Sequence, residues 1–162
     1  MPTWVELCED KRFQDLPYKI ELNGRGQIIM SPTYNYHGKF AFIIGSILRE
    51  NLPHGDVIVE CAVETADGVR EADVAWLNPE LADKVQDDYT CNPAPDICVE
   101  VISTSNSWEE MMHKRSLFIA AGAKEYWLCD REGKMRFFDG VKELPKSVFC
   151  PEFPIKLPRR KF

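Results

Sequence analysis

Residues 97–102 constrain the fold more than any other part of this chain, because they are apolar at odd and even positions alike, with the single exception of Glu100. A strand with one wet face alternates apolar and polar residues, so an uninterrupted run predicts a strand that is covered on both faces. The carboxylate of Glu100 loses its hydration in such a strand, which costs several kcal/mol unless a partner compensates. We therefore expect a buried sheet that holds a compensated acid.

Asp73 is a second acid of this kind, since it begins the short apolar run of residues 73–77. Two carboxylates at the edge of a dry sheet indicate a shared cation, and Mg²⁺ or Mn²⁺ is the usual cation at such oxygen ligands. Glu100 has another interpretation, in which it lies on an edge strand or pairs with a buried Arg or Lys, because structural ion pairs also place carboxylates inside proteins. The pattern alone leaves both interpretations open.

Length and composition fit a globular protein. The 162 residues fit one domain, 1–162, and suffice to bury a core, while 44% apolar and 28% charged residues are ordinary values. No stretch is long and apolar enough to predict a membrane span, and residues 1–6 lack the features of a signal peptide. The six cysteines are scattered, with no C-x-x-C pair. We expect a reduced, cytoplasmic location and no structural zinc site.

The formal net charge of −6 limits how the chain can bind nucleic acid. A protein that grips a phosphate backbone without sequence specificity is usually basic, so we expect DNA binding to be weak and salt-sensitive, with a homodimer or a basic partner supplying more surface. The basic tail, residues 156–161, is the exception, although such a cluster is more often a solvated terminus. Acidity does not exclude a metal nuclease, because the cation itself brings positive charge to the phosphate.

Periodicity and turn signals predict the order of elements. A short leading helix is expected over residues 3–16, followed by a hairpin around the turn at 23–26. The next elements are expected in the order helix, strand, strand, strand, helix, strand, at residues 36–51, 57–64, 72–77, 97–102, 107–121 and 126–129. One helical turn at 80–84 is expected before the third of these strands. Ser107 and Glu110 predict a capping box at the start of the second long helix, which ends at Gly122.

This order, with acids on the second and third strands, resembles the core of restriction-endonuclease-like proteins, the PD-(D/E)xK nuclease superfamily. The local sequence is similar to the Uma-two (Uma2) family of predicted endonucleases. The matching stretches are 18–24, 30–33 with His37, 70–74, 95–103, Lys114 with Phe118, and 121–128. They span most of the chain, from 18 to 138, and 95–128 is the most specific part. The resemblance implies an α/β fold of restriction-endonuclease type, a mixed sheet flanked by helices, here preceded by a hairpin.

The resemblance also assigns residues to the family pattern. Asp73 matches the superfamily aspartate, although Ala72 replaces the preceding proline, and Glu100 matches the glutamate of the E-x-K element. Ile102 occupies the position where that element has its lysine. In this family the lysine appears on the following helix, and Lys114 is the matching residue.

These matches imply a chemistry. Asp73 and Glu100, with the carbonyl of Val101, would hold Mg²⁺ or Mn²⁺, which would polarise a DNA phosphodiester and help to generate hydroxide. Lys114 would orient the attacking water or stabilise charge. The implied activity is that of a metal-dependent endodeoxyribonuclease. The alternative function is a nuclease-fold module with weakened or lost activity that acts in protein interaction, which the displaced lysine and the acidic surface keep open.

Several residues have a structural interpretation beside the functional one. Lys114 falls at the border of the apolar stripe of its helix, where a snorkelling lysine is common. Arg115 lies nearer the middle of that stripe and is a candidate buried partner of Glu100. His37 is within reach of the site, but a structural imidazole is the preferred interpretation, and Glu21 is interpreted as a surface residue rather than a supporting acid. Asp96 follows Pro95, and we expect it to cap the turn.

Overall fold

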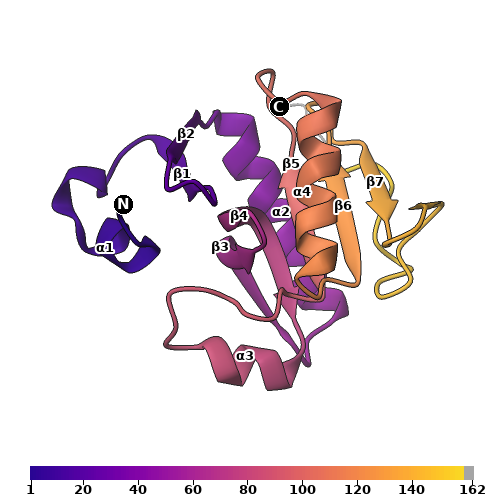
Figure 1. The fold of residues 1–162 in the computed structure, drawn as a ribbon. Helices are drawn as coiled ribbons and strands as arrows, with labels where there is room; N and C mark the ends of the chain where they lie inside the picture. Colours follow the sequence, from indigo (N-terminus) through magenta and orange to yellow (C-terminus); the bar gives the residue numbers. More distant parts are fainter. Residues whose placement is uncertain (159–162) are drawn as a thin grey trace.

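The computed structural model describes residues 1–158, and these contain one eight-stranded sheet with helices on both faces (Figure 1). The helices are α1 (Trp4–Glu9), α2 (Asn35–Asn51), α3 (Pro79–Val85) and α4 (Trp108–Ala120), with a 3₁₀ turn η1 (Lys11–Phe13). The strands are β1 (Tyr18–Leu22), β2 (Ile28–Pro32), β3 (Asp56–Thr65), β4 (Gly68–Leu77), β5 (Ile97–Val101), β6 (Glu125–Cys129), β7 (Met135–Phe138) and β8 (Glu143–Leu144). The expected succession of helix, three strands, helix and strand is confirmed.

The central strands are β4, β5 and β6. The sheet order is β2-β1-β4-β5-β6-β7-β8, and β3 pairs with β4. Strands β5 and β6 run parallel because α4 carries the chain back between them, whereas the other pairings are antiparallel. Every residue of β5 and of β6 is buried. The continuous apolar run around Glu100 therefore belongs to a strand covered on both faces, as its pattern predicts.

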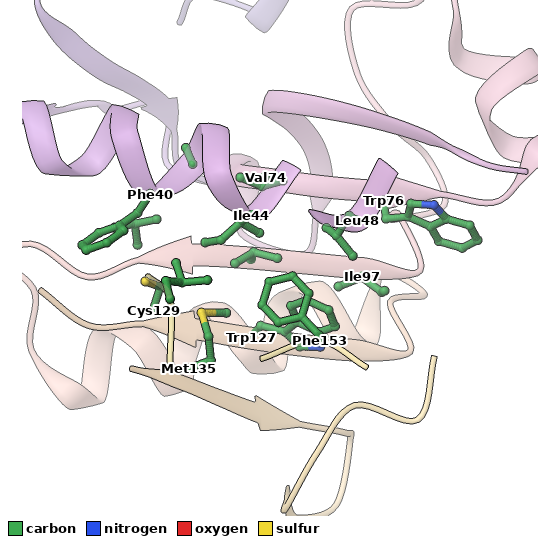
Figure 2. Packing of buried hydrophobic residues seen from close by; sticks show 14 of the residues in the cluster. Phe40, Ile44, Leu48, Val74, Trp76, Ile97, Trp127, Cys129, Met135 and Phe153 are labelled. Atoms are coloured by element: carbon green, nitrogen blue, oxygen red, sulfur yellow. The ribbon is translucent and has the colours of Figure 1, made fainter. Parts of the chain in front are cut away.

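Helix α2 covers one face of the sheet. Its buried residues Phe40, Ile44 and Leu48 are spaced one turn apart and belong to one cluster with Val74 and Trp127 of the sheet (Figure 2). Phe153 from the C-terminal segment joins the same cluster, with its ring centroid 4.6 Å from that of Trp127. This cluster fixes α2, and with it His37, over the end of β5.

Helix α4 covers the opposite face. Met111 and Phe118 of α4 pack with Ala75 and Tyr126 of the sheet in a second cluster, to which α3 contributes Leu81. The helix buries Met111, Lys114, Leu117 and Phe118. Lys114 therefore lies within the buried stripe, and the prediction that it lies at the border of that stripe is wrong.

The chain departs from the sequence expectations at two helix termini. The leading helix ends at Glu9, because the Asp10 side chain accepts a hydrogen bond from the Arg12 backbone and starts η1 instead. At α4 only half of the expected capping box forms. Ser107 Oγ accepts the Glu110 N–H at 3.1 Å, but the Glu110 carboxylate accepts from Asn106 Nδ2 at 3.4 Å.

The C-terminal segment folds back on the sheet. Met135 N donates to Ile155 O, and Leu157 is buried. Of the basic tail, Lys156 forms a bridge with Lys134, and residues 159–162 lie outside the described residues. Among the described helices, none has the length and apolar character needed to cross a membrane.

Candidate functional site

A cavity of about 470 Å³ opens at the end of β5, where the chain turns into α4. Its lining comes from six elements: β1, β2, α2, β4, β5 and α4. The charged and titratable side chains in the lining are Lys19, Glu21, His37, Arg70, Asp73, Glu100, Glu110, His113 and Lys114. Residues from distant parts of the sequence therefore meet at one end of the sheet.

Asp73 and Glu100 form the floor of this cavity. Strands β4 and β5 are antiparallel with Val74 opposite Val99, so Asp73 and Glu100 are the next residues outward on the two neighbouring strands. Asp73 is 2% exposed and Glu100 is 3% exposed. The pairing of the strands thus brings together two carboxylates that have almost no contact with solvent.

Lys19 of β1 lies between these two carboxylates. Its Nζ is 3.0 Å from Asp73 Oδ1 and 3.0 Å from Glu100 Oε2. Burial disfavours the charge of Lys19, but the charges of Asp73 and Glu100 outweigh it and raise the lysine pKa well above its ordinary value. The two acids therefore share one cation, which is an ammonium group of the chain itself.

Lys114 of α4 approaches the pair from the other side. Its Nζ donates to Glu21 Oε1 at 2.7 Å and to Glu71 O at 3.0 Å, and it lies 2.9 Å from Glu100 Oε1. The angle at that last contact is unfavourable for a hydrogen bond, so Glu100 Oε1 has a cationic neighbour but no hydrogen-bond donor among the described residues. This buried oxygen is therefore held by a charge and not by a hydrogen bond.

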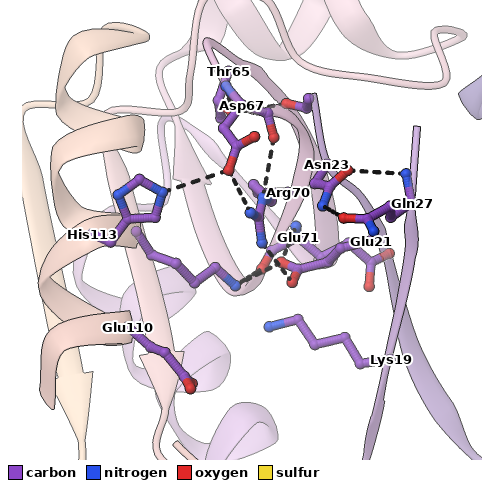
Figure 3. Close-up of polar contacts among 12 residues, drawn as sticks. Lys19, Glu21, Asn23, Gln27, Thr65, Asp67, Arg70, Glu71, Glu110 and His113 are labelled. Atoms are coloured by element: carbon purple, nitrogen blue, oxygen red, sulfur yellow. Dashed lines mark hydrogen bonds and ion pairs between the residues drawn. The ribbon is translucent and has the colours of Figure 1, made fainter. Parts of the chain in front are cut away.

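Glu21 connects Lys114 to a second ion-pair group. Figure 3 shows Lys19 and Glu21 projecting from β1, with Arg70 facing Glu21. Arg70 lies 3.5 Å from Glu21 Oε2 and donates to Asp67 Oδ2 at 2.8 Å. Glu21 is 5% exposed, and although burial raises its pKa, the charges of Lys114 and Lys19 lower it below the ordinary value. The interpretation of Glu21 as a surface residue is wrong.

The other oxygen of Asp73 is held by α2 and by β5. Asp73 Oδ2 accepts the Val101 N–H at 2.7 Å and lies 3.1 Å from His37 Nε2. His37 therefore contacts an acid of the cavity floor. Burial lowers the pKa of His37, but the hydrogen bond to Asp73 together with the negative charges of Asp73 and Glu100 outweighs burial, and the imidazole pKa lies above its ordinary value.

Burial acts on both acids, yet their pKa values move in opposite directions. For Asp73, burial is outweighed by Lys19 and His37, so its pKa lies below the ordinary range. For Glu100, burial and the negative charge of Asp73 outweigh Lys114 and Lys19, and its pKa rises to about 7. Near neutral pH the floor therefore combines one firmly ionised carboxylate with one that takes up a proton readily.

The donor set fits a divalent cation in part. Asp73 and Glu100 already share one cation, the Lys19 ammonium, and Glu100 Oε1 has no hydrogen-bond donor. Among residues 1–158, no group of three or more His, Cys, Asp and Glu side chains is arranged to hold a metal ion. Two carboxylates with a backbone carbonyl suit Mg²⁺, because this ion usually keeps several waters and takes few protein ligands.

Arg115 and Asp96 both make structural contacts away from the two acids of the cavity floor. The guanidinium of Arg115 donates to Asp139 O at 2.6 and 3.0 Å and lies over the Phe138 ring, so its proposed pairing with Glu100 is wrong. Asp96 Oδ2 accepts from the Asn78 backbone and side chain, both at 2.9 Å, a structural role at the opposite end of β5.

The sequence interpretation missed Lys19. Its side chain reaches Asp73 and Glu100 across 54 and 81 residues of sequence. The available signal was its spacing from Glu21, because residues two apart on a strand share a face. A lysine and a glutamate on one face of a strand are expected to enter the same polar environment.

Comparison with known proteins defines first the fold and then the family. A crystal structure of "a putative nuclease belonging to DUF820" from Anabaena variabilis matches with a TM-score of 0.70 over 96% of this chain and 95% of that chain, at 16% sequence identity. This likeness shows the fold, and the expected mixed α/β architecture is confirmed. The model of the Uma2 family, described as "Putative restriction endonuclease", matches residues 10–139. The chain belongs to this family. No curated protein matches it.

Proposed function

We propose that this protein is a metal-dependent nuclease that hydrolyses DNA phosphodiester bonds at the cavity floored by Asp73 and Glu100. The observation that carries the proposal is the shared cation position between these two buried carboxylates. Lys114, the lysine implied by the family pattern, contacts the same glutamate at 2.9 Å. Membership of a family described as a restriction endonuclease supports this assignment.

Asp73, Glu100 and the Val101 carbonyl are the groups that would hold the cation. Bound there, Mg²⁺ or Mn²⁺ supplies positive charge to a phosphodiester oxygen and lowers the pKa of a water molecule. Val101 N–H and His37 fix the orientation of the Asp73 carboxylate. Before a cation binds, the pKa of Glu100 is raised to about 7, so a proton would compete with the cation for this carboxylate near neutral pH. Lys114 places an ammonium beside Glu100, where it stabilises negative charge that develops on the substrate.

The strength of DNA binding that we expect follows from the net charge of the chain. The chain has a net charge of −6, so a monomer is expected to bind DNA weakly and to lose that binding as salt rises. A homodimer would double the cationic surface available to one duplex. The expected compartment is the cytosol, where free cysteines stay reduced.

The test is cleavage of supercoiled, linear duplex and single-stranded DNA with Mg²⁺ or Mn²⁺ and with a chelator. Cleavage is expected with the metals and is expected to be lost in Asp73→Asn and Glu100→Gln. Asp96→Asn is the matched control, because this acid accepts hydrogen bonds from Asn78 at the opposite end of β5, and the change should leave cleavage unchanged. Cleavage that persists in Asp73→Asn would contradict the proposal.

A second candidate function is a nuclease-fold module that acts through protein interaction. The observation in its favour is again Lys19, because a carboxylate pair neutralised by an internal ammonium is stable as an ion-pair cluster without a metal. Absence of cleavage on every DNA form and with both metals would favour this function over the nuclease.

A further inference from the structure

We propose that Lys19 is an internal counter-cation for the metal position, so that a divalent cation binds between Asp73 and Glu100 only by expelling the Lys19 ammonium. The proposal deepens the proposed function, because it names the group that regulates the same site. It does not require that DNA is the substrate, since it concerns cation binding alone.

The first argument is the position of the ammonium. Lys19 Nζ is equally close, at 3.0 Å, to one oxygen of each acid, which is how a shared metal ion is placed. Lys114 is not equivalent to it. Lys114 contacts the other oxygen of Glu100 together with Glu21 and the Glu71 carbonyl, and therefore flanks the pair instead of bridging it.

The second argument is exclusion. A ligated Mg²⁺ lies about 2.0–2.1 Å from each carboxylate oxygen, so it would occupy the space in which the ammonium now lies. A Mg²⁺ ion and an ammonium group placed between the same two carboxylates would also repel each other strongly, because the site is almost fully buried. The carboxylates can therefore hold one of the two cations between them but not both.

The third argument is that Lys19 has somewhere to go. Lys19 lies on a part of β1 that is not paired with β4. Within the described part of the chain, the single register pair between these strands joins Leu22 and Val69, three residues beyond Lys19. Lys19 also lines a second cavity, of about 260 Å³, beneath the N-terminal helix. The carboxylates of Glu60 and Glu71 line that cavity too. A second cavity that contains acidic residues therefore lies beside Lys19 and would receive an expelled ammonium.

Mn²⁺ binding by calorimetry tests the proposal on Lys19→Met, which keeps the length of the side chain and removes the charge. Because a like charge is removed from the cation position, Mn²⁺ should bind roughly tenfold more tightly or better than to wild type. Lys114→Met should tighten binding by a smaller factor, because Lys114 flanks one acid only. Lys124→Met, an exposed lysine at the opposite end of the sheet, should leave the affinity unchanged. Equal or weaker binding by Lys19→Met would overturn the proposal, as would the absence of Mn²⁺ binding by both proteins.

A measurement on the wild type covers the case in which Lys19→Met does not fold. The ¹⁵Nζ signal of a buried, ion-paired ammonium is protected from hydrogen exchange, and Mg²⁺ should raise the exchange rate of the Lys19 ammonium at least several-fold. The Lys124 signal should not change. A Lys19 signal that stays unchanged while Mg²⁺ raises the melting temperature would contradict the expulsion.

The outcomes separate this inference from the proposed function. If Lys19→Met binds Mn²⁺ more tightly and the protein cleaves no DNA, the counter-cation role of Lys19 is supported and the nuclease function is excluded. If the protein cleaves DNA with a metal and wild type and Lys19→Met bind Mn²⁺ with equal affinity, the nuclease function is supported and the counter-cation role of Lys19 is excluded.

Discussion

Two glutamates on the neighbouring strands β5 and β6 are equally buried and differ in what holds them. Glu100, at the C-terminal end of β5, is 3% exposed, and its partners are the ammonium groups of Lys19 and Lys114. Glu125, at the start of β6, is 2% exposed and lies opposite Ile97 at the other end of β5. Its carboxylate accepts hydrogen bonds from neutral donors: Trp127 Nε1, Ser147 Oγ and the Val148 backbone, each at 2.7 Å, and the Phe149 backbone at 3.3 Å.

The difference shows that burial alone does not identify a functional carboxylate. Neutral donors from the backbone, a hydroxyl and an indole ring bind Glu125 and tie the C-terminal segment to the sheet, so its backbone donors cannot leave without moving that segment. The partners of Glu100 are flexible side chains, and one of its oxygens has no hydrogen-bond donor among the described residues. A carboxylate is available for ligand chemistry when its partners can be exchanged.

The largest predicted effect tests the contrast between the two glutamates and concerns the free energy of unfolding when Glu125 is replaced. Glu125→Ala should lower the free energy of unfolding by about 3–5 kcal/mol, because it leaves several buried donors unpaired at once. Glu100→Gln should cost less, since the amide keeps the volume of the side chain and the raised pKa already allows this carboxyl to be neutral near pH 6. Denaturant unfolding of the two variants measures the contrast. Equal losses would show that the two glutamates have the same role.

The burial of Glu100 can be predicted from the sequence, whereas the burial of Glu125 cannot. Glu100 interrupts an apolar run, so its burial can be predicted from its neighbours, and Asp73 follows by the same argument. Glu125 follows Lys124 at the start of a strand, where a polar residue is ordinary, and three of its four donors come from a segment more than twenty residues later. Lys19 was missed for the same reason, because its contacts depend on how the hairpin docks against the sheet. Local pattern predicts the strands and their acids, whereas the partners that tertiary packing brings to an acid cannot be predicted from the neighbours of that acid in the sequence.

The second effect concerns activity at the Glu100 end. If the proposed function holds, Lys114→Met should reduce DNA cleavage roughly a hundredfold or more, the scale for removing one electrostatic stabiliser from a dry site. Circular dichroism should show that the variant is folded. Single-turnover cleavage, with Asp73→Asn as the inactive reference, measures the loss. Wild-type turnover would exclude Lys114 as the catalytic cation and leave Lys19 as the cation that contacts both acids.

A smaller effect concerns another acid at the Glu125 end. Asp96 accepts two hydrogen bonds from Asn78, so Asp96→Ala should lower the unfolding free energy by about 1 kcal/mol. Its cleavage rate should equal that of wild type, because the side chain lies at the opposite end of β5 from the cavity. Thermal unfolding and cleavage assays on the same preparation test both parts. A loss of activity without a loss of stability would mean that the two ends of the sheet are coupled.

The smallest effect concerns Glu71, a partly buried acid of a third kind. Among the described residues its side chain has no hydrogen-bond partner, and burial raises its pKa to about 8. Between the unfolded value near 4.5 and about 8, the folded state binds more protons than the unfolded state, so this residue makes the free energy of unfolding fall as pH rises. Glu71→Gln removes that dependence. The variant should match wild type near pH 5 and be more stable above pH 8, by an amount that solvent screening keeps small. Urea unfolding at pH 5, 7 and 9 measures the difference between the two proteins, which cancels the contributions of Asp73 and Glu100. A difference that is independent of pH would show that Glu71 is ionised in the folded protein, and that it belongs with Asp73 among the acids held by cations.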